Sequence, residues 1–141
     1  MNLPTAIKDW LGKKEIPLAH LHGTLGERAA KKHLKQLGLK YLTANFQSDR
    51  GEIDLVFRDN DCLVFVEVKT RTREDFGRPF DAVNRDKQKR IARGGLAWLR
   101  LLDDPDILFR FDVVEVIIAE NAEPRIELLR NAFALPEPYI Y

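Results

Sequence analysis

One stretch, residues 51–71, constrains the fold more than any other because charged residues interrupt two strand-like runs. Residues 53–57 and 63–68 are rich in apolar and β-branched side chains, and the turn-forming cluster 59–61 separates them. This pattern predicts a β-hairpin. The charges inside the runs then become the informative part, because alternate residues of a strand point to the same face of the sheet.

The hairpin places acidic side chains opposite one another. If residues 60–61 form its loop, opposing positions sum to 121, so Asp54 faces Glu67 and Glu52 faces Lys69. Opposed carboxylates cost stability unless a cation lies between them, and Mg²⁺ binds one or two carboxylates together with water and substrate phosphate. Asp54 and Glu67 are therefore candidate metal ligands, with Lys69 on the same side. The alternative is an exposed face with an ion pair between Glu52 and Lys69, but the second strand is apolar on both faces, which favours burial.

The 141 residues have an ordinary composition and are long enough for one domain. We expect an N-terminal helical extension over residues 1–20, the main domain over 21–135, and an extended, loosely held tail over 136–141. No segment is apolar enough to span a membrane and the N-terminus does not resemble a signal peptide, so a cytoplasmic protein with no membrane partner is predicted. The single cysteine, Cys62, excludes an internal disulfide and is typical of a small apolar filler.

Charge is unevenly distributed along the chain. The net charge is +1, yet residues 69–100 contain ten basic and four acidic residues, a net charge of +6. A basic segment that follows a carboxylate and lysine cluster is suited to a phosphate backbone. The alternative interpretation is a solvated helix face.

Residues 23–37 have the apolar periodicity of a helix. Glu27 falls at the edge of its core-facing side, so it can either cap the helix with Thr24 or reach a site on the sheet. Its neighbour Arg28 is either a phosphate contact or a surface charge.

A second long helix is expected to begin at Asp81 or Asn84 and to reach about Leu102. Gln88 lies near its inner side, where either a structural hydrogen bond or a functional role would explain it. Further strands are expected at residues 41–46, 110–118 and 126–129. The resulting order predicts an α/β protein with a mixed sheet flanked by helices, in which the strand after the second helix is parallel to an earlier one.

Four polar residues are weaker candidates. Asp112 and Glu115 either support the site or mark a strand end and a solvent edge. His20 and His22 lack a third ligand nearby and are more typical of a loop than of a metal site.

Several ordered motifs carry a family resemblance. GERAAKKHL, GEIDLV, FVEVKTR, FGRP, KQKR, RFDVV and NAF, spread from about residue 23 to 133, resemble the YraN family of small bacterial proteins. The helix carrying Glu27, the strand carrying Asp54 and the run Glu67-Val68-Lys69 also resemble the wider PD-(D/E)xK superfamily, to which archaeal Holliday-junction resolvases are more distantly similar. This resemblance implies a restriction-endonuclease-like fold, with an αβββαβ core and an additional edge strand.

The resemblance also assigns roles to residues. It implies that Asp54 and Glu67 bind the metal, that Lys69 is catalytic and that Glu27 is an auxiliary acid. We expect the Val68 carbonyl and Glu27 to complete the metal shell.

Gln88 matches a polar helix position that assists in such sites. The chain departs from the superfamily pattern twice: Ile53 replaces the eponymous proline, and Ala92 stands where a tyrosine is common. The second departure removes one aid to substrate positioning.

These motifs together predict a Mg²⁺- or Mn²⁺-dependent endonuclease that hydrolyses DNA and needs no small-molecule cofactor. The distant relatives imply branched or junction DNA, which would favour a homodimer. The residues expected to grip the DNA backbone are Arg28, Arg71, Arg73, Lys87, Lys89, Arg90 and Arg93. Two alternatives are a non-catalytic module that binds nucleic acid or protein, and a nuclease that acts on RNA.

Overall fold

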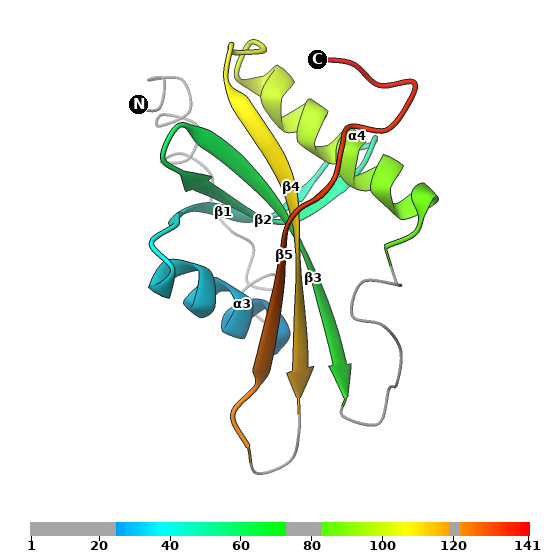
Figure 1. Ribbon diagram of the computed structural model, residues 1–141. Coiled ribbons are helices and arrows are strands. Elements are labelled where there is room, and N and C mark those ends of the chain that lie inside the picture. Colours follow the sequence, from blue (N-terminus) through cyan, green and yellow to red (C-terminus); the bar gives the residue numbers. More distant parts are fainter. Residues whose placement is uncertain (1–24, 73–82, 119–121) are drawn as a thin grey trace.

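The computed structural model describes residues 25–72, 83–118 and 122–141 (Figure 1). Its elements are α3 (Leu25–Gln36), β1 (Lys40–Gln47), β2 (Glu52–Asp59), β3 (Cys62–Thr72), α4 (Arg85–Leu101), β4 (Leu108–Ile118) and β5 (Arg125–Phe133). The predicted order of helices and strands is confirmed. The predicted N-terminal extension, His20, His22, Thr24, Arg73 and Asp81 lie outside the described residues.

The five strands form one mixed sheet in the order β1-β2-β3-β4-β5. All neighbours are antiparallel except β3 and β4, which are parallel because α4 connects them as a crossover. Asn60 and Asp61 form the two-residue loop of the β2–β3 hairpin, and Asn60 adopts the left-handed φ of 52° that such loops require. The predicted hairpin and the predicted parallel pairing are both confirmed.

The two helices cover opposite faces of the sheet (Figure 1). α3 buries Ala30 and Leu34 in a core that includes Val64, while α4 buries Trp98 in a second core that includes Phe65. Val64 and Phe65 are adjacent and fully buried, so the central strand is covered on both faces, as its apolar run predicts. No helix within the described ranges is both long and apolar enough to cross a bilayer. This is the restriction-endonuclease-like fold.

Glycines allow both helices to approach the strands at backbone distance. A Cβ atom added to Gly26, in the first turn of α3, would lie 1.8 Å from Oγ1 of Thr70 on β3. A Cβ atom on Gly51 would lie 2.1 Å from the carbonyl oxygen of Arg90, and one on Gly94 would lie 2.8 Å from that of Glu52. The motif glycines therefore fix α3 and α4 against the strand segments that carry the candidate acids.

The C-terminal tail is anchored, in contrast to the loose tail expected from the sequence. The Tyr139 hydroxyl accepts a hydrogen bond from Nη1 of Arg93 at 3.4 Å, and the Tyr139 N–H donates to the carbonyl of Pro136. The Tyr141 ring packs edge-on against Phe109 with 5.2 Å between ring centroids. Tyr139 and Tyr141 thus connect the tail to α4 and β4, although the Tyr141 side chain remains 49% exposed.

Candidate functional site

The candidate site forms where the paired ladder of β2 and β3 ends. The ladder keeps the predicted register as far as Leu55 opposite Val66. One position further, Oδ2 of Asp54 accepts a hydrogen bond from the backbone N–H of Val68 at 2.8 Å. Asp54 is therefore held beside Glu67 by a side-chain to backbone bond, because the direct opposition expected for these two residues lies beyond the last ladder pair.

The two carboxylates interact strongly. Burial is the largest cause of a raised pKa for Asp54, and the negative charge of Glu67 is the next; together they bring this pKa to about 8. The hydrogen bond from Val68 acts in the opposite direction but does not offset them. The Asp54 carboxyl therefore keeps its proton to a higher pH than a free aspartate does, and a bound cation would compete with that proton.

Lys87 supplies a cation to one of the two carboxylates. Its Nζ lies 2.8 Å from Oε1 of Glu67, and their side chains are 23% and 7% exposed. The N-cap of α4 positions this lysine, because Oδ1 of Asn84 accepts a hydrogen bond from the Lys87 N–H at 2.9 Å. The sequence analysis placed Lys87 among the DNA contacts and did not connect it with Glu67. The available signal was its spacing, since Lys87 lies one helical turn before the buried Ile91.

Lys69 lies on the same face of β3 as Glu67, as predicted from the alternation of side chains. In the parallel ladder Lys69 partners Glu115 of β4, and Nε of Arg71 lies 3.5 Å from Oε1 of this buried glutamate. Within the described residues Lys69 makes no ion pair. Glu115 thus forms an ion pair with Arg71 of β3. Lys69 is half-buried on the face of β3 that carries Glu67, and although it is opposite Glu115 in the ladder it forms no ion pair in this part of the chain.

The two helix residues expected at the site differ in position. Glu27, half-buried in the first turn of α3, contributes to the raised pKa of Asp54 and is therefore close to the pair. Gln88 donates a hydrogen bond from Nε2 to the carbonyl of Val83 at 3.2 Å, which gives its amide a structural role at the start of α4. The neighbour of Glu27, Arg28, is exposed.

The other predicted DNA contacts on α4 fall into two groups. Arg93 is half-buried and bonded to the tail through Tyr139. Arg90 is exposed and lines a hollow of about 290 Å³ together with the turn between β1 and β2, while Lys89 is half-buried nearby in the sequence. Arg90 is thus the most accessible cation of this group.

The donor set is suited to an ion that takes few protein ligands. In the described parts of the chain, no group of three or more His, Cys, Asp or Glu side chains could hold a metal ion. A closed zinc-type site is therefore not formed by these residues. Two adjacent carboxylates, one of them with a raised pKa, together with the Val68 carbonyl fit Mg²⁺ or Mn²⁺, which keep several water ligands.

A second polar cluster lies elsewhere on the sheet. Nη1 of Arg110 is 3.0 Å from Oδ2 of Asp59, and Nε of Arg110 is 3.1 Å from Oδ1 of Asp112, whose side chain is fully buried. Asp112 also accepts a hydrogen bond from the Asn131 N–H at 2.8 Å. We call Arg110, Asp59 and Asp112 the Arg110 cluster. Asp112 belongs to it and does not support the Asp54 and Glu67 pair.

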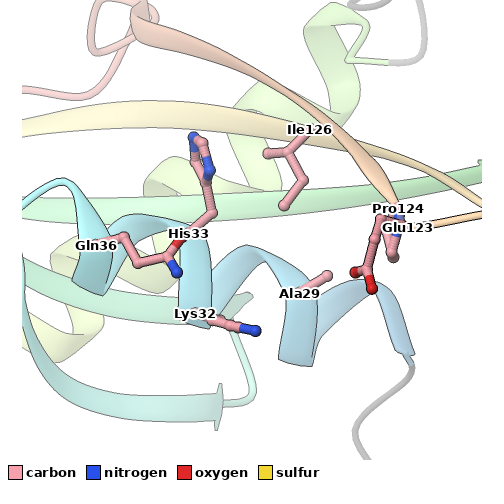
Figure 2. Close-up of a pocket in the computed structure, with 7 residues that line it drawn as sticks. All are labelled: Ala29, Lys32, His33, Gln36, Glu123, Pro124 and Ile126. Carbon is pink, nitrogen blue, oxygen red and sulfur yellow. The ribbon is translucent and has the colours of Figure 1, made fainter.

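A further hollow, of about 340 Å³, lies between α3 and the start of β5 (Figure 2). Its lining comprises Ala29, Lys32, His33, Gln36, Glu123, Pro124 and Ile126. Neither candidate carboxylate lines it. The chemistry of the candidate site is therefore separate from this hollow.

The chain is similar to a family of bacterial proteins over most of its length. The model of the "Uncharacterised protein family UPF0102" matches residues 26–116. A UPF0102 protein of Trichlorobacter lovleyi is 42% identical over 114 residues, which cover 80% of this chain and 90% of that protein. A Geobacter sulfurreducens relative is 42% identical over 80% of this chain and 88% of its own, and a Rhodococcus opacus relative is 40% identical over 79% and 94%.

Proposed function

This chain belongs to the UPF0102 family, which is the YraN family, and we propose that it is a divalent-metal-dependent nuclease that hydrolyses DNA phosphodiester bonds. The observation that carries the proposal is the pair Asp54 and Glu67, which share a partly buried site although burial and mutual repulsion raise the pKa of Asp54 to about 8. Perturbed carboxylates held together at a cost in stability are typical of functional sites.

The donor chemistry supports Mg²⁺ or Mn²⁺ as the ion. Asp54, Glu67 and the Val68 carbonyl would hold it, with Glu27 acting through water from α3. When bound, such an ion neutralises charge on the scissile phosphate and acidifies a water molecule. The chain itself contributes the placement of these groups, because the Val68 N–H orients the Asp54 carboxylate.

The two lysines take different parts in the proposed reaction. Lys69 would orient the attacking water and stabilise negative charge on the phosphate oxygens. Lys87 contacts Glu67, and from this position it would neutralise a phosphate oxygen of the bound DNA. Arg90 would contact the backbone beyond the scissile bond, without reading the sequence. We further propose that the substrate is branched DNA and that a homodimer cuts its two strands.

A second candidate is a module that binds nucleic acid or protein without cleaving. The ion pair between Lys87 and Glu67 favours it, because a lysine that already neutralises a carboxylate leaves less need for a metal. The hydrogen bond from Gln88 to Val83 favours it too, because it gives a residue expected in catalysis a structural partner.

The test combines calorimetry with cleavage. Mg²⁺ and Mn²⁺ are titrated into the wild type, Glu67→Ala and the control Glu127→Gln, which removes a carboxylate paired with Arg125 at the edge strand. A panel of linear, flapped, single-stranded and four-way DNA, and a matching RNA, is incubated in parallel. We expect metal binding and cleavage in the wild type and the control, and neither in Glu67→Ala. Salt-sensitive DNA binding without any metal binding would instead establish the binding module.

A further inference from the structure

α3 presents an unbroken stripe of cations. Arg28, Lys31, Lys32 and Lys35 are spaced i, i+3, i+4 and i+7, which places them along one side of the helix. Lys40, the first residue of β1, follows after the helix ends. We call these five residues the α3 stripe. It lies outside the basic segment 69–100 and across the sheet from α4 (Figure 1).

Four of the five cations of the stripe have no acidic partner in the described part of the chain. These four are Lys31, Lys32, Lys35 and Lys40, which make no ion pair there. Helix cations are commonly balanced by acids one turn away, but the single acid of α3, Glu27, is close enough to Asp54 to raise the pKa of that residue.

Two contacts in the stripe bring like charges together. Nζ of Lys31 lies 3.7 Å from the centroid of the Tyr41 ring, and Nζ of Lys35 lies 5.5 Å from the same centroid. Burial and the charge of Lys35 both lower the pKa of Lys31. Lys40 is paired directly opposite Arg58 in the β1–β2 ladder. Like charges at these spacings cost stability, and the contacts with the Tyr41 ring offset only part of this cost.

The charge of the whole chain is concentrated in two places. Residues 25–41 carry +4 and residues 69–100 carry +6, and because the whole chain carries +1, the remainder carries −9. The two basic segments include helices on opposite faces of the sheet, and each helix also brings a residue to the carboxylates, Glu27 from α3 and Lys87 from α4. The candidate site therefore lies between two helices that are both rich in cations.

We propose that the α3 stripe is a second binding surface for the phosphate backbone of a nucleic acid. The inference rests on the proposed function and deepens it, because a polymer with one phosphodiester at Asp54 and Glu67 must continue past the site. The α3 stripe begins at Arg28, one residue after Glu27. It therefore lies where a nucleic-acid strand would leave the site on the α3 side. Exposed lysines bind phosphates and carry no sequence readout.

An anionic membrane surface fits the stripe less well. A helix that binds a membrane surface inserts an apolar side into the lipid. Most of the apolar side of α3 is already buried, since Ala30 and Leu34 are fully inaccessible in the core, and this leaves Leu25 and Leu37 exposed at the two ends of the helix. Lys32 extends along the outer side of the helix, at the rim of the hollow beside β5 (Figure 2).

The test measures DNA binding separately from cleavage. The affinity for a fluorescent 20-bp duplex (a length of about two helical turns) is measured by anisotropy, in EDTA and over a series of salt concentrations. The triple variant Lys32→Gln/Lys35→Gln/Lys40→Gln should bind roughly 10- to 100-fold more weakly, and the slope of log K against log salt should become shallower by about 2 to 3. Lys32→Gln alone should change the slope by about 1, which keeps the test valid if the triple variant folds poorly.

The control removes the same number of charges from the exposed residues Arg100, Arg125 and Arg130, each changed to Gln. A stripe variant that binds no more weakly than this control, with an unchanged slope, would overturn the inference. So would a stripe variant that loses only binding to phosphatidylglycerol vesicles. Cleavage of the same duplex with Mn²⁺ is measured separately. A wild type that binds DNA through the stripe but does not cut it would refute the nuclease proposal and leave the stripe proposal standing.

Discussion

Two clusters on the sheet each combine two carboxylates with one cation, yet only in one of them does the cation contact both acids. In the Arg110 cluster one guanidinium contacts both acids, and the Asn131 N–H adds a further bond to Asp112. In the other cluster, which we call the Lys87 cluster (Asp54, Glu67 and Lys87), the lysine contacts Glu67 and Asp54 receives a backbone N–H.

The difference separates structure from function. Burial would lower the pKa of Arg110, but hydrogen bonds to Asp112 and Asp59 raise it, so the ionised form is favoured. The pKa of Asp54 moves in the direction that favours its neutral form. In the Arg110 cluster both carboxylates have a cationic partner, whereas in the described part of the chain no cation pairs with Asp54, which is where the proposed metal ion would bind.

The largest expected effect is on cleavage. Asp54→Ala should reduce the DNA cleavage rate by roughly 10³-fold or more, because it removes a proposed metal ligand. Asp59→Ala, which removes an acid from the Arg110 cluster, should leave the cleavage rate per folded molecule within a few-fold of the wild type. Similar losses in both variants would mean that the two clusters do not differ as we describe.

For stability we expect the opposite: substitutions in the Arg110 cluster should cost more than substitutions in the Lys87 cluster. Arg110→Met should lower the free energy of unfolding by about 3–5 kcal/mol, because it leaves the fully buried Asp112 without its cation. Lys87→Met should cost less, since Lys87 is partly exposed and contacts one carboxylate. Urea denaturation of both variants measures the difference. The double variant Arg110→Met/Asp112→Leu should recover part of the loss, and no recovery would indicate that Arg110 acts mainly through packing.

The pH dependence should identify Asp54. Its pKa is raised on folding, so its contribution to the stability of the metal-free protein is present below pH 4 and is lost as the pH rises towards about 8. The slope should be smaller than the 1.4 kcal/mol per pH unit of one whole proton. Asp54→Asn should flatten this slope in thermal unfolding followed from pH 4 to 8. Mn²⁺ affinity of the wild type should rise over the same range, because binding displaces the proton.

The smallest effect concerns the packing that brings Glu27 to the carboxylates. Gly26→Ala places a methyl group against Thr70 and should lower the free energy of unfolding by about 1–3 kcal/mol. Thr70→Ala in the same chain should restore much of this loss, because it removes the contacting hydroxyl. Equal stability of wild type and Gly26→Ala would show that α3 can move away from β3 at little cost.

Much of the Lys87 cluster could be predicted from local sequence, because its two acids lie on one hairpin. A two-residue loop fixes the hairpin register as far as Leu55 and Val66, and the hydrogen bond from the Val68 N–H then holds Asp54 beside Glu67. The contact between Lys87 and Glu67 could not be predicted in the same way. It depends on how α4 docks after a long connection, and the glycine contacts that set this docking involve Gly51 and Gly94, 43 positions apart.

The Arg110 cluster illustrates the same limit. Arg110 and Asp112 are two residues apart on one strand, but Asp59 and Asn131 come from other strands. From the sequence, Asp112 could equally support the candidate site or mark a strand end or a solvent edge. The β4–β5 pairing decides between these interpretations, because it brings the Asn131 N–H to the Asp112 carboxylate. Charges buried in a sheet are assigned only when the partner strand and its register are fixed.

The connection between β3 and β4 has a consequence for the order of folding. Their parallel pairing joins residues 46 positions apart, such as Cys62 and Leu108, whereas a two-residue loop closes the β2–β3 hairpin. Hairpins form within microseconds, and contacts distant in sequence form later. We therefore expect the chain to bring Asp54 and Glu67 together before Lys87 reaches them. If the two acids already repel one another in the transition state, neutralising Asp54 should raise the rate of folding.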